Sequence, residues 1–188
     1  AIMNKEQPVA GNISIVNYYN GDDQGNAVNV SGLLHAKGNV EIINQESDIL
    51  MCAGDIIANT VTLNAQKNIV LENGSVEAKS AFLTATEGAI TQVLNGNAYG
   101  HELAVKNLTV KAGNGVSLAS HDNKLENIYL DVSGTGVNIG NGNTGNTALR
   151  IYVKEGATLT ENITITNYNN LAAGELGNDI LIDGNLAT

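Results

Sequence analysis

Apolar and polar residues alternate in short runs along this chain. Residues 49–65 contain three such runs, whose apolar members are Ile49 and Met51, Ile56 and Ala58, and Val61, Leu63 and Ala65. Alternation with a period of two places successive side chains on opposite faces of a β-strand. Small and polar residues at 53–54, 59–60 and 66–68 separate the runs and predict turns. We therefore predict three short strands in this stretch.

The same pattern returns with a 20-residue period. Residues 74–85 overlay residues 54–65 without a gap, and residues 67–70 and 87–90 overlay residues 47–50. A repeat of this length in a β-rich sequence indicates a solenoid. Every coil runs in the same direction, so equivalent strands pair in parallel about 4.8 Å apart. The predicted fold is all-β, a right-handed parallel β-helix (solenoid) with roughly 20–21 residues and three short strands per coil.

The overlay also predicts which residues stack inside the coils. The expected columns are Ile49 with Ile69 and Ala89, Ile56 with Val76, Ala58 with Ala78, Leu63 with Leu83, and Ala65 with Ala85. Further on, Leu130 and Val132 are expected to match Ile151 and Val153, and Ile139 to match Leu159. The interval from Leu83 to Val110 is longer than one repeat, which predicts a loop insertion at residues 92–101.

Composition supports one folded unit. The 188 residues are 43% hydrophobic and 15% charged, with 4% aromatics, 21 Gly and one Pro. Small and β-branched residues must therefore fill the core. We expect residues 1–188 to be a single β-helix segment excised from a longer protein, with residues 1–26 irregular or capping. No apolar run approaches the roughly 20 residues of a membrane-spanning helix, so this segment is not expected to insert into a membrane.

Charge excludes one class of partner. The formal net charge is −10, from 9 Lys and Arg against 19 Asp and Glu, and the basic residues form no cluster. Binding to nucleic acid depends on basic residues that displace counterions from phosphates. Nucleic acid is therefore not an expected partner, and the same balance disfavours anionic membrane surfaces.

The residues that carry out chemistry in enzymes and metal sites are scattered. His35, His101 and His121 match no metal-binding spacing, and we interpret them as solvated surface residues. Cys52 aligns through the repeat with Glu72 and Gln92, which indicates an exposed thiol in a turn. No cofactor, metal site or catalytic residue is predicted, and the chain is not expected to be an enzyme.

Binding on solenoids usually resides in loops that leave the regular surface. The irregular stretches are those around Tyr18, the 92–101 insertion and Tyr168. The candidate binding residues in these loops are Tyr18, Tyr19, Asp22, Asp23, Tyr99, His101 and Tyr168.

Two further sequence motifs indicate a ligand or modification site less specifically. Residues 177–185 resemble a calcium-binding nonapeptide, with Asp179 and Asp183 as acidic ligands, although that motif requires tandem copies to complete each site. Asn-x-Ser/Thr acceptor sequences occur at Asn12, Asn29, Asn73, Asn107 and Asn162.

The repeat texture resembles the filamentous-haemagglutinin family of large exoproteins. The resemblance rests on inward Val, Ile, Leu and Ala triplets with Asn/Gly turns, as in residues 54–58, 61–65 and 87–91. It implies a rod-like segment of a secreted or surface-displayed bacterial adhesin, a virulence factor exported by two-partner secretion. The implied partners are an outer-membrane transporter for the parent protein and a host-cell receptor or glycan. The Asn-Pro-Asn-Leu secretion motif is absent from this sequence, which implies that the secretion signals lie outside it.

Two alternatives stay open. Polysaccharide lyases, hydrolases and tailspike-like depolymerases also use β-helices, with carboxylates and a basic residue along a groove. A purely structural surface spacer needs no binding site at all.

Overall fold

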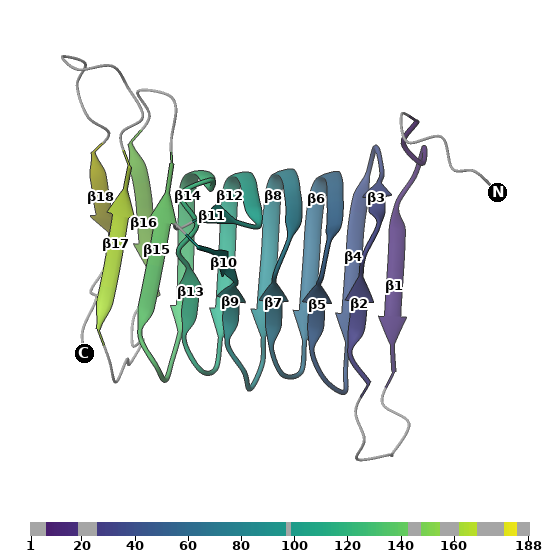
Figure 1. The fold of residues 1–188 in the computed structure, drawn as a ribbon, viewed down its shortest axis with the longest axis horizontal. Helices are drawn as coiled ribbons and strands as arrows, with labels where there is room; N and C mark the ends of the chain where they lie inside the picture. Colours follow the sequence, from purple (N-terminus) through teal and green to yellow (C-terminus); the bar gives the residue numbers. More distant parts are fainter. Residues whose placement is uncertain are drawn as a thin grey trace.

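The computed structural model describes residues 7–18, 26–96, 99–142, 148–154, 162–168 and 179–183. Every regular element in these ranges is a β-strand, and nearly all of them belong to two parallel sheets. The strands lie side by side along the long axis of the molecule, in chain order within each sheet (Figure 1). This arrangement is a parallel β-helix, as the repeat predicts.

One sheet contains the long strands. Its members in spatial order are β1 (Ile13–Asn17), β4 (Asn39–Asn44), β6 (Gly54–Ala65), β8 (Gly74–Ala85), β12 (Glu102–Ala112), β14 (Lys124–Val132), β16 (Leu149–Val153) and β18 (Ile180–Asp183), with β3 (Leu33–His35) also paired to β6.

The other sheet contains shorter strands that alternate with the long ones along the chain. Its members are β2 (Val28–Val30), β5 (Ile49–Met51), β7 (Ile69–Leu71), β9 (Ile90–Gln92), β13 (Val116–Leu118), β15 (Val137–Asn141) and β17 (Ile163–Asn167). Each central coil therefore consists of one short strand and one long strand.

The long strand contains a corner. In β6, buried and partly exposed residues alternate except at Asn59 and Thr60, where two successive side chains point outward. The same break occurs in β8 at Lys79 and Ser80. The three alternating runs of the sequence are thus real, but two of them form one bent strand, with the predicted turn at residues 59–60 reduced to this bend.

The core is a set of apolar columns parallel to the long axis. Ile56, Val61 and Leu63 are fully buried, and so are their partners in the next coil, Val76, Ala81 and Leu83. The columns remove these side chains from water, which is the dominant stabilising contribution in a fold of this kind.

The predicted register is confirmed in the central coils. Ile56 pairs with Val76, Ala58 with Ala78, Leu63 with Leu83 and Ala65 with Ala85. The longer step across the insertion is also confirmed, because Leu83 pairs with Val110 and Ala85 with Ala112.

Four predicted pairs differ from the structure, namely Ile69 with Ala89, Leu130 with Ile151, Val132 with Val153, and Ile139 with Leu159. Ile69 pairs with Ile90 rather than Ala89, because the turn before β9 has one residue more than the turn before β7. Leu130 pairs with Val153 rather than Ile151, and Ile139 pairs with Ile165. Leu159 lies outside the described residues. A shift from Ile151 to Val153 preserves the inward and outward alternation, so periodicity cannot distinguish these registers.

The predicted insertion contains a small antiparallel hairpin. β10 (Leu94–Asn95) pairs with β11 (Tyr99–Gly100) between β9 and β12. At the other end of the stack, β1 pairs in parallel with β4, so residues 13–17 belong to the same sheet as the central coils.

No helix in the described ranges is long and apolar enough to cross a membrane.

Candidate binding face

The outward side of the long-strand sheet, beyond the corner, contains a regular grid of side chains. Four successive coils each contribute three residues at alternate positions, and strand pairing aligns these residues into columns. We call this grid the tyrosine face. Its first column is Ser80, Asn107, Asn127 and Arg150, its central column is Phe82, Thr109, Tyr129 and Tyr152, and its last column is Thr84, Lys111, Asp131 and Lys154.

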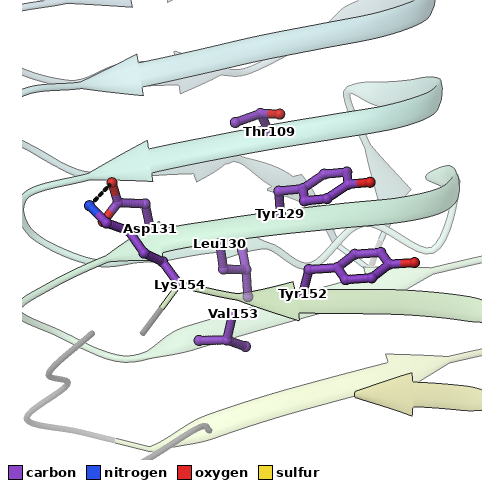
Figure 2. A pocket seen from close by; sticks show the side chains of 7 residues that line it. All are labelled: Thr109, Tyr129, Leu130, Asp131, Tyr152, Val153 and Lys154. Atoms are coloured by element: carbon purple, nitrogen blue, oxygen red, sulfur yellow. Dashed lines mark hydrogen bonds and ion pairs between the residues drawn. The ribbon is translucent and has the colours of Figure 1, made fainter. Parts of the chain in front are cut away.

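The two tyrosines of the central column stack on each other. The ring centroids of Tyr129 and Tyr152 are 4.7 Å apart and the ring planes differ by 10°. Figure 2 shows the rings side by side on neighbouring strands, with both hydroxyls pointing the same way and away from Asp131 and Lys154. Tyr129 is 43% exposed, and so is Phe82 two coils earlier. The column therefore presents aromatic surface to solvent where a sheet usually presents polar residues.

An open recess of about 340 Å³ lies against these rings. Its lining residues are Thr109, Tyr129, Leu130, Asp131, Tyr152, Val153 and Lys154 (Figure 2). The Lys154 Nζ lies 2.8 Å from the Asp131 Oδ2 and forms an ion pair between neighbouring coils. The volume is at the low end of the range for small-molecule sites, about 300–1,000 Å³.

The first column supplies amide groups beside the rings. The Asn127 side-chain amide donates to the Asn107 Oδ1 at 3.0 Å and to the Lys106 carbonyl at 3.4 Å. These bonds occupy both N–H groups of Asn127 and hold its side chain in one orientation. Arg150 follows in the same column and is exposed. The face thus combines aromatic, amide and cationic groups in fixed positions.

Those predicted loop residues that the structure describes do not gather at one place. Tyr18 is 69% exposed at the end of β1. Tyr168 contacts His121 with ring centroids 3.5 Å apart. Tyr99 lies in β11, and its side chain is outside the described residues, as are Tyr19, Asp22 and Asp23.

His101 is buried, which corrects its interpretation as a surface residue. Its exposed fraction is 0%, and neither ring nitrogen has a hydrogen-bond partner among the described residues. Burial lowers the pKa of His101 from 6.5 to about 4, although the charge of Asp55 and the backbone of Glu102 act in the opposite direction. The imidazole is therefore neutral at physiological pH.

A buried amide network lies next to His101. Gln92 donates to the His101 carbonyl and to the Asn123 Oδ1, each at 2.7 Å, and Asn123 donates back to the Gln92 Oε1 at 3.0 Å. Asn123 also donates to the Leu118 and Gly140 carbonyls. The network satisfies backbone groups where the hairpin interrupts the regular coil.

The position of Gln92 corrects a second prediction. Gln92 pairs with Leu71, so its predicted alignment with Glu72 is wrong. Leu71 is fully buried, and Gln92 occupies the same inward column. The extra residue in the turn before β9 moves Gln92 by one position, and a shift of one position reverses the direction of a side chain in a strand.

The structure also places the cysteine and the two aspartates that the sequence analysis considered. Cys52 lies half-buried in the turn between β5 and β6, with its Sγ 3.9 Å from the Asn29 Oδ1. Asp179 and Asp183 are exposed at the two ends of β18. Within the described ranges, no group of three or more His, Cys, Asp or Glu side chains is placed to hold a metal ion.

Sequence reasoning missed the tyrosine face because it searched the irregular loops. A signal was present, since Phe82 aligns with Thr62 and both occupy outward positions of the best repeat. Tyr129 aligns with Thr109 in the same way, one coil apart. Following the outward positions as closely as the inward ones would have found the column.

Comparisons of this chain with protein-family models, with curated proteins and with solved structures find no match.

Proposed function

We propose that this chain is a rod-like segment of a secreted or surface-displayed bacterial adhesin. In this proposal the β-helix provides reach and stiffness, and its outer surface contacts a host-cell receptor or glycan. The parent protein is a virulence factor of the filamentous-haemagglutinin type, exported through an outer-membrane transporter. The observation that carries the proposal is the continuous parallel ladder from β1 to β18, together with an aromatic grid exposed on one of its sides.

The ladder favours a mechanical role. Each coil bonds to the coil before it and the coil after it, and the apolar columns continue across those boundaries. Bending such a stack requires breaking strand pairing and apolar contact at the same time, so the stack resists bending. A stiff rod suits a protein that holds a binding surface away from a cell.

One feature of the structure bears on the enzymatic alternative. A second recess, of about 510 Å³, contains Glu77, Glu102 and Lys124 among its lining residues. Lys124 lies 2.5 Å from Glu102, and this hydrogen bond is the main reason that the pKa of Lys124 is raised. The recess thus contains two carboxylates and one basic residue, the set that the enzymatic alternative requires, and we retain polysaccharide cleavage as the second candidate function.

Adhesion of coated beads tests the proposal. Beads carrying the purified chain are expected to adhere to cultured epithelial cells, and free chain is expected to compete with them. Beads coated with an unrelated protein of equal net charge are the control. Adhesion no greater than that of the control would contradict the binding role and favour the structural spacer. Release of new reducing ends from a panel of acidic and neutral polysaccharides would instead favour the enzyme.

A further inference from the structure

We infer that the tyrosine face binds an extended glycan that carries carboxylate groups, with the chain of sugars running along the rod. The inference deepens the proposed function and rests on it, since it assigns the ligand class and places the binding surface on the sheet rather than in the loops. The two proposals can nevertheless fail separately, because one is tested on cells and the other with isolated glycans.

The spacing of the tyrosine face matches an extended chain of sugars. Equivalent side chains of successive coils are separated by the strand spacing, about 4.8 Å. This distance is close to the length of one pyranose unit in an extended polysaccharide. Successive sugars would therefore meet Tyr152, Tyr129 and Thr109 in turn, each in the same column. A folded protein partner has no such one-dimensional repeat.

The chemistry of the central column suits a sugar ring. A pyranose has C–H groups on its faces and hydroxyls around its edge. The stacked rings of Tyr129 and Tyr152 supply an apolar platform with two hydroxyls along one side. The recess against these rings gives the platform depth. Thr109 is smaller than its aromatic neighbours and leaves space beside Tyr129.

Polar groups lie on the two sides of the tyrosine rings. The bonds made by Asn127 leave its Oδ1, and the amide N–H groups of Asn107, directed to no partner among the described residues. These groups are an acceptor and a donor on adjacent coils, suited to the hydroxyls of neighbouring sugars. On the other side, the paired Asp131 and Lys154 present both signs of charge.

The local charge of the tyrosine face differs from that of the whole chain. The chain as a whole carries −10, but the tyrosine face includes three cations, Lys111, Arg150 and Lys154, and one anion, Asp131, while the next coil adds Asp183 beside Tyr152. Because Asp131 pairs with Lys154, Arg150 and Lys111 are left to attract an anionic ligand. At physiological salt, charges beyond about 8 Å are largely screened. The local excess of positive charge therefore governs the attraction of a ligand to this face.

A glycan array tests the inference directly. The full chain is applied to an array of neutral, uronate-bearing and sialate-bearing oligosaccharides, and the affinity of each positive is then measured by calorimetry. We expect binding restricted to carboxylated glycans. The double variant Tyr129→Ser/Tyr152→Ser is expected to weaken it about tenfold or more, as for loss of aromatic contacts. Arg150→Gln is expected to weaken it less and to reduce its dependence on salt.

Matched controls separate the tyrosine face from general effects. Val9→Ser removes an exposed apolar side chain away from the tyrosine face, and Lys79→Gln removes an exposed cation on the other side of the corner. Both are expected to bind as the unchanged chain does. Circular dichroism checks that every variant is folded, and Arg150→Gln, which keeps the ring stack, serves if the double variant is not.

Several results would overturn the inference. These are no binding to any glycan on the array, binding to neutral glycans only, or acidic binding that survives in the double variant. Dimerisation that depends on concentration and disappears in the double variant would assign the face to a second copy instead. If glycans bind but beads do not adhere to cells, the ligand class stands and the adhesin role fails.

Discussion

The coils from Gly54 to Ala85 and the coil from Ala85 to Ala112 are neighbours in one sheet, but their interiors differ. In the first region, strands β6 and β8 match without a gap from end to end, and the inward positions are apolar. In the second, the coil is lengthened by the hairpin, and Gln92, His101 and Asn123 are buried behind it. Regular coils are stabilised by repeated apolar contacts, whereas the interrupted coil requires specific hydrogen bonds at one corner.

The largest expected effect is loss of the corner network. Asn123→Ala removes the partner of Gln92, of the Leu103 amide and of two carbonyls, all in a fully buried site. Because several buried groups lose a hydrogen bond at once, the free energy of unfolding should fall by about 4 kcal/mol. Urea denaturation measures the change, with the more exposed amide variant Asn127→Ala as the control. A loss below about 1 kcal/mol would mean that water replaces the network.

A slightly smaller effect is expected in the regular coils. Leu63 is fully buried between Ile42 and Leu83, and Leu63→Ala leaves a cavity in the column. The free energy of unfolding should fall by about 3 kcal/mol. The control variant Thr62→Ala changes the outward neighbour of Leu63 and should cost far less. Equal losses in the two variants would show that the column is not the stabilising element.

Acid should weaken the interrupted coil through His101. Since burial lowers the pKa of His101 to about 4, the unfolded chain takes up a proton first as the pH falls below 6.5. Stability contributed by this group is complete above that value and declines toward pH 4, with a loss of about 2 kcal/mol between pH 7.5 and pH 5. Denaturation curves at the two pH values measure it. The variant His101→Leu should show a smaller pH dependence, and an unchanged one would exclude His101 as the cause.

The smallest expected effect concerns the tip of the hairpin. Asn95 donates to the Asn73 Oδ1 at 2.9 Å, an exposed hydrogen bond between the insertion and the preceding coil. Asn95→Ala should lower stability by about 0.5 kcal/mol, because water replaces an exposed partner easily. The same denaturation assay applies. A loss comparable with that of Asn123→Ala would show that the tip, rather than its buried base, holds the insertion.

These two regions also show how much of the fold can be predicted from the sequence. The regular coils could be predicted almost residue by residue, because alternation and repeat length point to the same register. The longer interval from Leu83 to Val110 could also be predicted from the sequence. The inward orientation of the Gln92 and His101 side chains could not. Polar residues in an insertion predict exposure, and only the packing of β9, β13 and β15 around them makes that interpretation wrong.

The outward positions of the tyrosine face show the same limit of prediction from sequence. The number of residues between Tyr129 and its partner Tyr152 differs from the repeat length of the central coils. Any other number would have placed the two rings apart. Their contact depends on how much chain the connections between β14 and β16 contain. Repeat reasoning alone expected Ile151 to follow Leu130, which would have moved Tyr152 away from Tyr129.

By itself, the amino-acid sequence determined that this protein is a parallel β-helix and which side chains of its central coils point inward. It could do so because burial enforces a period of two along a strand and a constant period between coils. Only the tertiary structure decided which outward residues become neighbours and that His101 lies in the core. Outward positions carry no burial constraint, so their alignment follows from the length of each coil, which the alternation of apolar and polar residues does not record.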